Sequence, residues 1–482
     1  MIFFFKNKSL FLYFAFSILL LIFVLKIFGS YLLDIPLHFD EAQYWEWSQN
    51  LEWGYFSKPP LLATLIKLST LLCGDTEFCI RLSSPILYLL SSILIFFSVK
   101  LLTKSNYLSG FSAFVFYLMP GITFSSFVIS TDVPLIFFSS AFAYLFLLIY
   151  KKKNCSVSYF FLLGIVSSLG FLSKYAMAYH LTTLIILFIF YKNVRTKFLS
   201  YKFIFFIIPA IVLLLPHLYW NYINSFVTFN HTADNANFQK IVINIKELVL
   251  FLMSQFIVFG IYPFYCITKK IYFLKHFEEE MEILYIFFLL PIIIIAFVAL
   301  LSRANANWAV VGYPFGCILL AKILEKKDFM HERMYSLISQ IVLGISIVII
   351  ISIGKYISAV DPFAKQKYAK DLAKEIKKEL ASIENVAFMA DDREDYALML
   401  FYLKEFNGKR AKWNGDIKIN DHYELTTNVN NLKGHNILFL TRTTPTEKML
   451  DRSNSSKFLK SLSFKERNKT KVFNLYLLKD WR

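Results

Sequence analysis

Long apolar runs dominate this chain and restrict what it can fold into. Hydrophobic residues make up 57% of the 482 positions, whereas soluble domains are closer to about 45–50% apolar. A helix needs about 20 apolar residues to cross a bilayer. We therefore predict an α-helical polytopic membrane protein and exclude a disordered chain or an ordinary cytosolic enzyme. Roughly eleven runs reach or approach the spanning length: 9–33, 80–102, 106–123, 131–150, 158–173, 176–191, 203–222, 246–267, 283–301, 308–323 and 334–357.

Basic residues between the runs predict the orientation. Short loops rich in Lys and Arg stay in the cytoplasm, and every second gap is basic. We therefore expect a multi-pass protein with its first loop (34–79) and everything after 358 outside the cytoplasm. Nucleic acid is not an expected partner, because the net charge of +17 comes partly from these short gaps. The basic positions precede the first run at Lys6 and Lys8 and lie in the gaps at 100–104, 151–153, 192–197, 269–275 and 322–327.

The composition changes after residue 358, which suggests two domains. Residues 1–358 are predicted to form the transmembrane domain. Residues 359–482 are more polar and contain short alternating runs, which predict a small soluble α/β domain. Its expected elements are strands at Val386–Met389, Asn436–Leu440 and Val472–Leu478 and a helix at Tyr396–Phe406.

The first loop begins with two adjacent acids, Asp40 and Glu41, within the sequence His38-Phe-Asp-Glu-Ala-Gln-Tyr-Trp-Glu-Trp47. One interpretation is structural: Asp40 caps the following helix, and the aromatic residues belong to an interfacial belt. The other is functional, because two carboxylates at a membrane–water interface can act on a substrate there. Sequence physics alone leaves both interpretations open.

A proline-fixed lysine follows in the sequence Gly54-Tyr-Phe-Ser-Lys-Pro-Pro60. The two prolines hold the chain extended and fix the direction of Lys58. A lysine near a membrane face usually extends its charge towards water, but one fixed in this way can also hold a phosphate. Residues 61–73 are apolar but too short to span, and we expect a re-entrant or interfacial helix.

Asp132 opens the fourth apolar run, followed closely by Pro134. An acid at the edge of a membrane span is costly and suggests function. The alternative is that Thr131 or Asp132 caps the helix, with Pro134 in its first turn.

Together these motifs resemble the GT-C glycosyltransferases that use polyprenyl-phosphate sugars. The resemblance is carried by Asp40-Glu41-x-x-Tyr44, Tyr55-Phe-x-Lys58-Pro and Asp132, and by the segments 216–221 and 305–308. The nearest families are the bacterial aminoarabinose and galactosamine lipid A transferases and the protein O-mannosyltransferase superfamily. The resemblance implies a GT-C fold in a bacterial inner membrane, with the catalytic first loop (34–79) and the C-terminal domain in the periplasm. It also implies an inverting transfer from an undecaprenyl-phosphate sugar to an envelope acceptor. Lipid A is the first expected acceptor and a protein hydroxyl the second, with no cofactor and no metal.

The resemblance also implies roles for individual residues. Asp40 is the expected catalytic carboxylate, a general base where the acceptor is a hydroxyl. Glu41 is a second acid or a support, Lys58 binds the donor phosphate and stabilises it as leaving group, and Asp132 supports the donor or Lys58. Substrate binding is expected from residues of the first loop and of the outer ends of the spans: Tyr44, Tyr55, Lys174, His217, Trp220, Asn221, Arg303 and Trp308.

Two departures from the aminoarabinose transferases affect substrate identity. Those enzymes carry Arg where this chain has Gln43, and Glu where it has Ser57. The same sugar and acceptor are therefore not assumed.

His217 is read as a buried core histidine rather than a metal ligand, because its spacing from His231 matches no zinc motif. Asp391 and Asp392 are read as a turn after a strand.

Cys73 and Cys79 both fall in the first loop, where an oxidising periplasm permits a disulfide, although their spacing does not establish one.

Other functions remain as alternatives. A lipid or glycan transporter predicts inverted repeats and charges at mid-membrane, which the sequence does not show. An O-antigen ligase or polymerase is expected to have a large late loop, and a receptor or scaffold a binding motif in the tail.

Overall fold

The computed structural model describes residues 8–235, 243–270, 278–354, 356–357, 359–416, 418–467 and 469–482. Its contacts divide the chain into two compact units. The helical unit comprises Met1–Ser30, Lys58–Leu65 and Arg81–Val348, and the mixed unit comprises Tyr31–Ser57, Ile66–Ile80 and Ile349–Arg482. The mixed unit therefore joins most of the first loop to the C-terminal part. Of the basic positions used to predict orientation, Lys6 and Lys275 lie outside the described residues.

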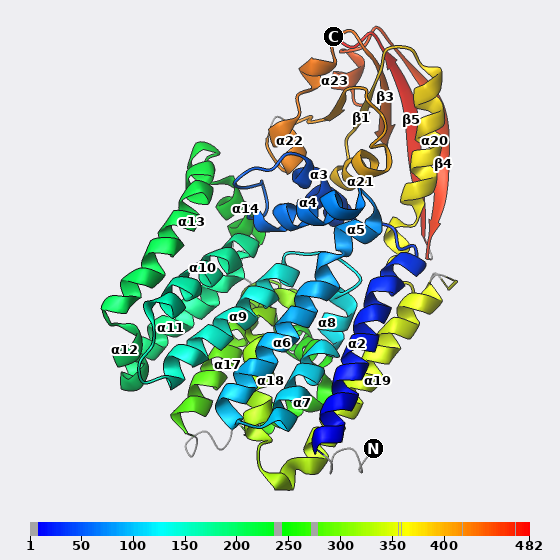
Figure 1. Cartoon of the computed structure of the whole chain (residues 1–482). Coiled ribbons are helices and arrows are strands. Elements are labelled where there is room, and N and C mark those ends of the chain that lie inside the picture. The colour runs from blue at the N-terminus through cyan, green and yellow to red at the C-terminus, as the bar shows by residue number, and fades with distance from the viewer. Residues whose placement is uncertain are drawn as a thin grey trace. The chain divides into compact units, whose positions relative to one another are not determined.

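The helical unit is a bundle of long helices, with shorter helices between them (Figure 1). The helices begin and end near the predicted apolar runs, and several break at Gly or Pro. Their bounds are α2 Lys8–Leu32, α6 Ser83–Thr103, α7 Asn106–Tyr117, α8 Pro120–Ser125, α9 Asp132–Lys151, α10 Val157–Ser173, α11 Ala178–Phe190, α12 Lys192–Phe198, α13 Ile204–Ile223, α14 Val227–Asn235, α15 Ile245–Phe259, α16 Ile261–Lys270, α17 Glu279–Leu301, α18 Tyr313–Ile323 and α19 Met330–Gly354.

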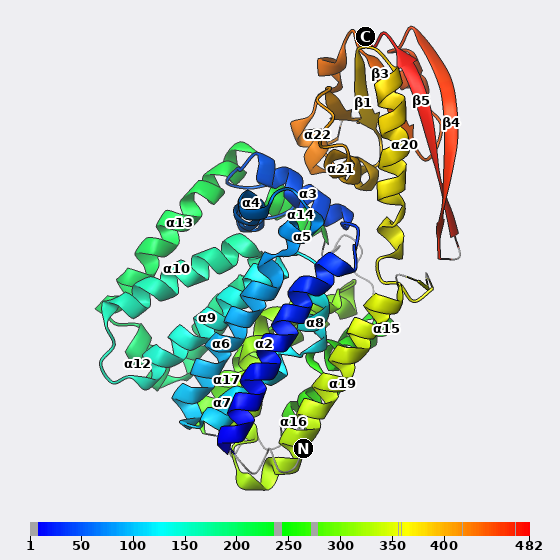
Figure 2. The same cartoon turned by 45° about the vertical axis from the view of Figure 1, so that its right-hand side comes forward.

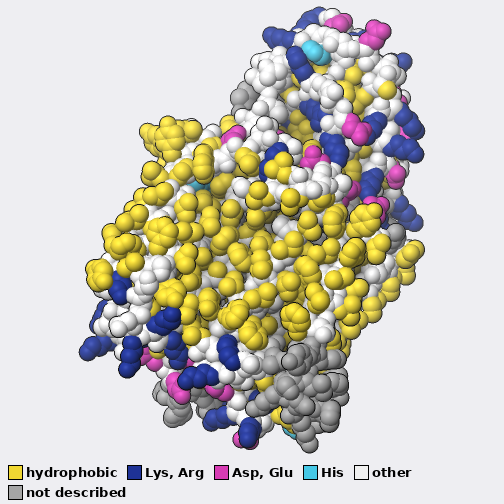
Figure 3. Space-filling model, viewed as in Figure 1, with side chains coloured by type: hydrophobic (Ala, Val, Ile, Leu, Met, Phe, Trp, Pro, Cys, Tyr) yellow, Lys and Arg dark blue, Asp and Glu magenta, His cyan; other side chains and the backbone are white. Residues whose placement is uncertain are grey.

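The surface of these helices is suited to lipid. Within the described part of the chain, six helices are long and apolar enough to cross a membrane, or up to eight if each of two bent pairs is one span. Apolar side chains gather over the helices in Figure 3, and large ones such as Ile211 and Leu215 of α13 remain exposed. The chain thus has the helices of a multi-pass membrane protein, while the count of eleven spans stays a prediction.

Helix α10 packs closely against α13 because a glycine lies at their contact. A Cβ at Gly164 would lie 2.3 Å from the backbone oxygen of Phe206. Small residues permit this backbone approach in membrane helix pairs. Gly164 therefore sets the separation of the two helices.

The C-terminal part of the mixed unit contains a five-stranded sheet in the order β2-β1-β3-β5-β4. Its strands are β1 Val386–Ala390, β2 Arg410–Lys412, β3 Asn436–Thr441, β4 Ser455–Glu466 and β5 Lys469–Lys479. Strand β1 pairs in parallel with β2 and β3, whereas β5 pairs antiparallel with β3 and β4. The three predicted strands are confirmed as β1, β3 and β5, and the α/β class is confirmed with them.

Alternate residues of the central strands face opposite sides of this sheet, as the two-residue period requires. Ala387 and Met389 of β1 belong to an apolar cluster with Phe439 and Trp481. On the other side, Phe388 stacks on Tyr396 of helix α21. Helix α21 (Arg393–Tyr402) confirms the helix predicted at Tyr396–Phe406, although it begins three residues earlier and ends four residues earlier. Helix α20 (Tyr368–Ser382) runs beside the sheet and contacts β4 (Figures 1 and 2).

The first-loop helices are α3 Phe39–Gln49, α4 Leu61–Cys73 and α5 Glu77–Arg81. The short helix predicted at 61–73 is present as α4. Helix α3 packs on α21 within the mixed unit, where Trp45 meets Phe401 edge-to-face with ring centroids 5.0 Å apart. The Tyr402 hydroxyl accepts a hydrogen bond from the Leu37 backbone N–H at 3.0 Å. Cys73 and Cys79 are joined by a disulfide. The N-terminus of α3, which carries the acid pair, thus rests on the C-terminal fold.

Candidate functional site

The N-terminus of α3 is capped by His38 and Glu41 rather than by Asp40. The His38 ring nitrogen Nδ1 accepts from the Asp40 N–H at 3.2 Å, and Glu41 Oε2 accepts from the His38 N–H at 2.8 Å. This is a reciprocal capping box. Glu41 is buried and its described contact supports the helix end. The Asp40 side chain is 41% exposed, so its carboxylate faces solvent at a helix N-terminus, where negative charge is favoured.

A cation that the sequence analysis did not single out lies beside this carboxylate. Arg393, the first residue of α21, donates from Nη1 to Asp40 Oδ1 at 3.3 Å and to Gln43 Oε1 at 2.7 Å. Its guanidinium also lies over the Phe39 ring, 4.9 Å from the centroid. About a third of its side chain is exposed (35%). The mixed unit therefore holds an acid and a guanidinium together in an accessible position.

Tyr44 and Tyr55, predicted to bind substrate, are buried in the packing of the first loop. The Tyr55 ring stacks on Trp47 at 4.4 Å, and its hydroxyl donates to the Trp47 backbone oxygen at 3.0 Å. Burial raises the pKa of Tyr55, which keeps the phenol protonated. Tyr44 lies 5.2 Å from the Trp47 ring. In the structure both tyrosines support α3, and their contact with a substrate stays a prediction.

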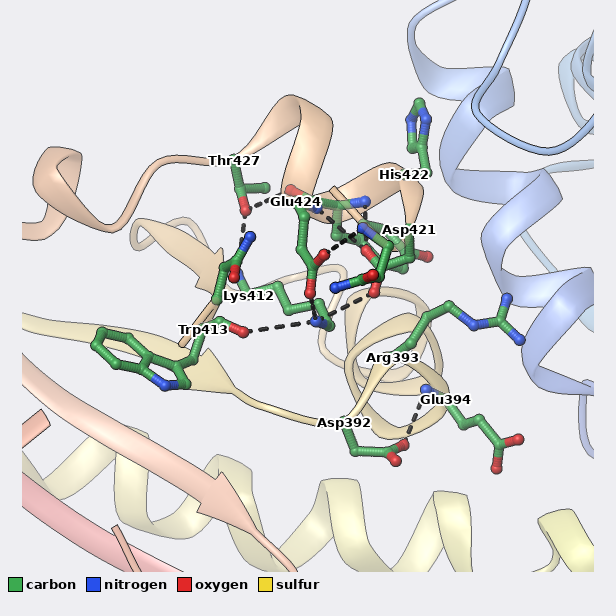
Figure 4. Close-up of polar contacts among 12 residues, drawn as sticks. Asp392, Arg393, Glu394, Lys412, Trp413, Asp421, His422, Glu424 and Thr427 are labelled. Carbon is green, nitrogen blue, oxygen red and sulfur yellow. Dashed lines mark hydrogen bonds and ion pairs between the residues drawn. The ribbon is translucent and has the colours of Figure 1, made fainter. Parts of the chain in front are cut away.

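A buried ionic cluster holds the next segment of the C-terminal fold. Lys412 of β2 bonds Glu424 and lies 3.1 Å from Asp421 Oδ2, and Figure 4 shows its side chain directed between them. Asp421 caps helix α22 (His422–Thr426) by accepting from the backbone N–H groups of Tyr423 and Glu424. The cluster fixes α22, whose His422 ring meets Trp47 edge-to-face at 5.2 Å. Burial lowers the pKa of His422 to about 3, so this imidazole is neutral at ordinary pH.

Asp391 and Asp392 form the turn that the sequence analysis expected. Asp391 Oδ2 accepts from the Thr441 hydroxyl at 2.7 Å. Asp392 caps α21 by accepting from two backbone N–H groups and lies 3.3 Å from Arg442. These acids therefore shape the start of α21, which also sets the position of Arg393.

In the helical unit, Asp132 forms the centre of a polar cluster. It opens α9 after Thr131, whose side chain makes no capping bond. Asp132 Oδ1 pairs with Lys174 Nζ at 2.6 Å, and Oδ2 accepts from Asn307 Nδ2 at 2.5 Å. Lys174 ends α10, and Asn307 lies in the 3-10 helix η4 (Ala306–Gly312). The predicted residues Asp132 and Lys174 thus meet, while the role of Asn307 was not predicted.

His217 is a buried, hydrogen-bonded histidine on α13. Its Nε2 lies 2.8 Å from the Tyr175 hydroxyl and 3.3 Å from the Asn221 amide nitrogen. Asn221 and Trp220 are also buried, and the buried Asn221 Oδ1 finds no partner among the residues that the structure describes. His217 and Asn221 are brought together as the sequence analysis grouped them, with Tyr175 as an unexpected third member.

The remaining predicted residues lie on connections of the helical unit. Lys58 is half-buried and precedes the buried prolines 59 and 60. Arg303 is exposed between α17 and η4, and Trp308 is half-buried within η4. Over the described ranges, no group of three or more His, Cys, Asp or Glu side chains is arranged to hold a metal.

Comparison with known proteins gives the family context. The family described as "Dolichyl-phosphate-mannose-protein mannosyltransferase" matches residues 57–220. Lipid A galacturonosyltransferase RgtD of Rhizobium johnstonii (strain DSM 114642 / LMG 32736 / 3841) is 30% identical over 291 residues, which are 60% of this chain and 60% of that protein. The chain thus aligns with about three fifths of the length of this curated relative.

The fold matches solved structures over nearly the whole chain. ArnT from Cupriavidus metallidurans in the apo state aligns with a TM-score of 0.67 at 11% identity, covering 96% of this chain and 97% of that one. The same protein bound to undecaprenyl phosphate aligns with a TM-score of 0.67 at 12% identity, covering 95% and 97%. At these identities the likeness establishes the fold.

Proposed function

We propose that this chain is a GT-C glycosyltransferase that transfers a sugar from a polyprenyl phosphate to an envelope acceptor. The proposal is supported by the match of the mannosyltransferase family to residues 57–220, by the 30% identity to RgtD and by the fold shared with ArnT. Undecaprenyl phosphate is the carrier that fits a bacterial source, and its presence in a structure of similar fold supports this choice. Lipid A is the first acceptor to consider, because the relative RgtD is a lipid A galacturonosyltransferase. A hexuronic acid is accordingly the first sugar to test.

The observation that carries the proposal is the exposed Asp40 carboxylate at the N-terminus of α3, held by Arg393. In inverting transfer, the bond from the sugar C1 to the donor phosphate breaks and a bond from C1 to the acceptor oxygen forms on the opposite face. Where the acceptor is a hydroxyl, Asp40 takes its proton. Where it is a phosphate, no proton is taken and Asp40 orients the reacting groups. Arg393 is a positioning residue that fixes the Asp40 carboxylate.

Lys58 is proposed to hold the donor phosphate. The phosphate gains negative charge as the C1–O bond breaks, and an ammonium beside it stabilises that charge. Proline fixes the φ angle and restricts the residue before it, so the Lys58-Pro-Pro sequence orders this segment before the donor arrives. The Asp132–Lys174–Asn307 cluster is proposed to shape the donor site of the helical unit.

A periplasmic location is proposed for the mixed unit. The Cys73–Cys79 disulfide supports it, because disulfides persist in oxidising compartments. The alternation of basic gaps along the sequence points the same way. This side of the membrane is where a lipid-linked sugar and an envelope acceptor meet.

The test is mass spectrometry of lipid A and lipid-linked glycans from cells carrying the wild type or Asp40→Asn. We expect a mass increment of one sugar on lipid A with the wild type, and its loss in Asp40→Asn at equal membrane abundance. Asp34→Asn is the matched control, because Asp34 is an exposed acid of the same segment, 68% exposed and paired with Lys370; it should keep the modification.

Two results would redirect the proposal. An unchanged increment in Asp40→Asn refutes Asp40 as the reacting carboxylate. A difference confined to glycoproteins identifies a protein hydroxyl as acceptor, the alternative that the description of the matching mannosyltransferase family supports.

A further inference from the structure

Helix α12 turns sharply away from the apolar helix before it. It is bent by 114° relative to the helical segment that ends with α11, at one end of the helical unit (Figure 1). The Val194 and Phe198 side chains of α12 are buried, whereas those of Lys192 and Arg195 are exposed. A helix that turns across a span and keeps an apolar face inward presents its cations to the surface of the membrane.

Further cations come from the segments beside α12. Lys197 bonds the Tyr150 backbone oxygen, and Lys202 of the 3-10 helix η2 (Tyr201–Phe203) donates to the Cys155 backbone oxygen at 2.6 Å. These contacts hold α12 and η2 against the connection between α9 and α10. Lys and Arg side chains gather at this end of the helical unit (Figure 3). The α12 basic surface consists of Lys152, Lys153, Lys192, Arg195, Lys197 and Lys202.

The positive charge of the α12 basic surface is not neutralised by acids. Arg195 donates to two backbone oxygens at the end of α11, and Lys152 donates to the Tyr159 hydroxyl at 2.8 Å. Among the described residues, none of the six cations is paired with a carboxylate. Lys322 shows the contrast, because its ammonium lies within 4.0 Å of three carboxylates.

Three acids of α17 lie beside α12 and are held by other groups: Glu279 by Asn193, Glu280 by Lys151 and Glu282 by Tyr191. The six cations of the α12 basic surface thus face three acids. The surface keeps a net positive charge, which attracts anions.

Exposed apolar side chains border the α12 basic surface on both sides. Ile189 and Phe190, at the end of α11, are 60% and 74% exposed, and Leu199 and Tyr201, after α12, are 50% and 76% exposed. A free anion or an acidic protein segment would leave this apolar border in water, and an uncharged lipid would leave the cations unmatched. An anionic phospholipid satisfies both, with its phosphate at the cations and its acyl chains along the apolar side chains.

We propose that the α12 basic surface binds anionic phospholipids in the membrane leaflet at this end of the helical unit. The assignment stands on the orientation of α12, its unneutralised cations and their apolar border. It does not depend on the proposed transfer reaction, because it uses none of the residues placed in that site.

The test is native mass spectrometry of the full-length protein released from micelles of an uncharged detergent. Phosphatidylglycerol is the probe. The comparison probes are phosphatidylcholine, which has no net charge, and glycerol 3-phosphate, which has no acyl chains. We expect phosphatidylglycerol to bind about tenfold more tightly than phosphatidylcholine, because each cation near an anionic lipid contributes about fivefold in affinity. Glycerol 3-phosphate should bind far more weakly, since it cannot contact the apolar border.

A triple variant locates the site. Lys153→Gln, Lys192→Gln and Arg195→Gln together should lower the affinity for phosphatidylglycerol about tenfold and leave that for phosphatidylcholine unchanged. All three side chains are exposed, so the melting temperature without added lipid should stay close to that of the wild type. The matched control, which should bind as the wild type does, removes three exposed lysines of the mixed unit: Lys374→Gln, Lys418→Gln and Lys433→Gln.

Ionic strength provides a test that needs no variant. Raising the salt concentration from about 0.1 M to about 1 M shortens the Debye length from about 10 Å to about 3 Å, so phosphatidylglycerol should lose its advantage over phosphatidylcholine. Equal binding of the two lipids at low salt, unchanged binding by the triple variant, or an equal loss in the control would each overturn the assignment. Glycerol 3-phosphate binding as tightly as phosphatidylglycerol would also overturn it and would identify a site for free anions.

Discussion

Glu46 should destabilise the folded mixed unit at alkaline pH, and Glu46→Gln should relieve this effect. The carboxyl lies on α3 with Oε2 buried and unpartnered among the described residues. The His422 Nε2 atom is 3.9 Å away, but burial keeps that ring neutral by lowering its pKa to about 3. Desolvation, with a smaller contribution from Glu52, raises the pKa of Glu46 from 4.5 to about 7.

The sign follows from proton binding. Between the pKa of the unfolded chain near 4.5 and that of the folded chain near 7, the folded state holds more protons at Glu46. Stability therefore falls as pH rises through this window, and the full cost applies above pH 7. The pKa difference corresponds to about 3 kcal/mol. Because 26% of the side chain stays exposed, we expect about 2 kcal/mol after solvent screening.

The assay is thermal unfolding of the full-length protein in detergent, followed by tryptophan fluorescence. Most of the tryptophans belong to the mixed unit. A gain of about 2 kcal/mol should raise the melting temperature of Glu46→Gln by about 4–8 °C at pH 8, and by less than half of that at pH 5. Glu405→Gln, at a side chain that is 77% exposed, is the control and should change little at either pH. A loss of stability at pH 8, or an equal gain at both pH values, would refute the reasoning and indicate a paired carboxylate.

Three further predictions concern the two units. Arg393→Ala should lower the transfer rate about tenfold with donor affinity little changed. Arg393→Lys should recover only part of that rate, because an ammonium lacks the planar fork of Arg. Separate measurements of kcat and KM check both expectations. Neutralising Asp132 or Lys174 alone should destabilise the helical unit by about 3–5 kcal/mol, because a single change leaves one charge buried and unpaired. The double substitution Asp132→Asn with Lys174→Met should destabilise it by less than the sum of the two single changes. Melting temperatures of the three variants give the double-mutant cycle. Gly164→Val should lower the melting temperature and the yield of folded protein, because its Cβ would lie 2.3 Å from the Phe206 backbone oxygen; Gly164→Ala should do so less.

Local patterns predicted the elements whose burial alternates or repeats regularly. Strand β3 is buried along most of its length, and its run of apolar residues, Asn436–Leu440, identifies it without tertiary information. Strand β4 was not predicted, because its residues are mostly exposed or half-buried and β5 supplies its pairing. The apolar run of α4 has 13 residues, too few for the about 20 that a membrane span needs, and this difference identified it as a short helix.

The sequence predicted a role for a single site residue only where the type of that residue and its position nearly determine the role. The acid at position 132 marked a functional or capping position from its place at the edge of an apolar run. Its partners, Lys174 and Asn307, come from other helices, and no local pattern relates them. At α3 the sequence offered Asp40 as the cap, whereas His38 and Glu41 perform it. His38 acts as the cap together with Glu41, which accepts the other hydrogen bond of the capping box. The preferences of single residues for the capping position favour Asp, so they did not predict this arrangement.

The contact between Asp40 and Arg393 changes how the C-terminal part should be tested. These residues are 353 positions apart, and α21 presents Arg393 while also packing against Trp45 and Leu37 of the first loop. Deleting the C-terminal part would therefore expose an apolar face of α3 and remove the guanidinium from Asp40 at the same time. Loss of transfer after such a deletion would not separate acceptor binding from collapse of the loop.

Point substitutions within the intact mixed unit do separate these roles. Arg393→Ala removes the guanidinium but leaves the Trp45–Phe401 contact, whereas Phe401→Ala removes the packing and leaves Arg393 in place. If the C-terminal part acts only as a support, both variants should lose activity in proportion to their loss of melting temperature. If Arg393 positions Asp40, Arg393→Ala should lose far more activity than its small change in stability explains, because a one-third exposed ion pair contributes at most about 1 kcal/mol to folding.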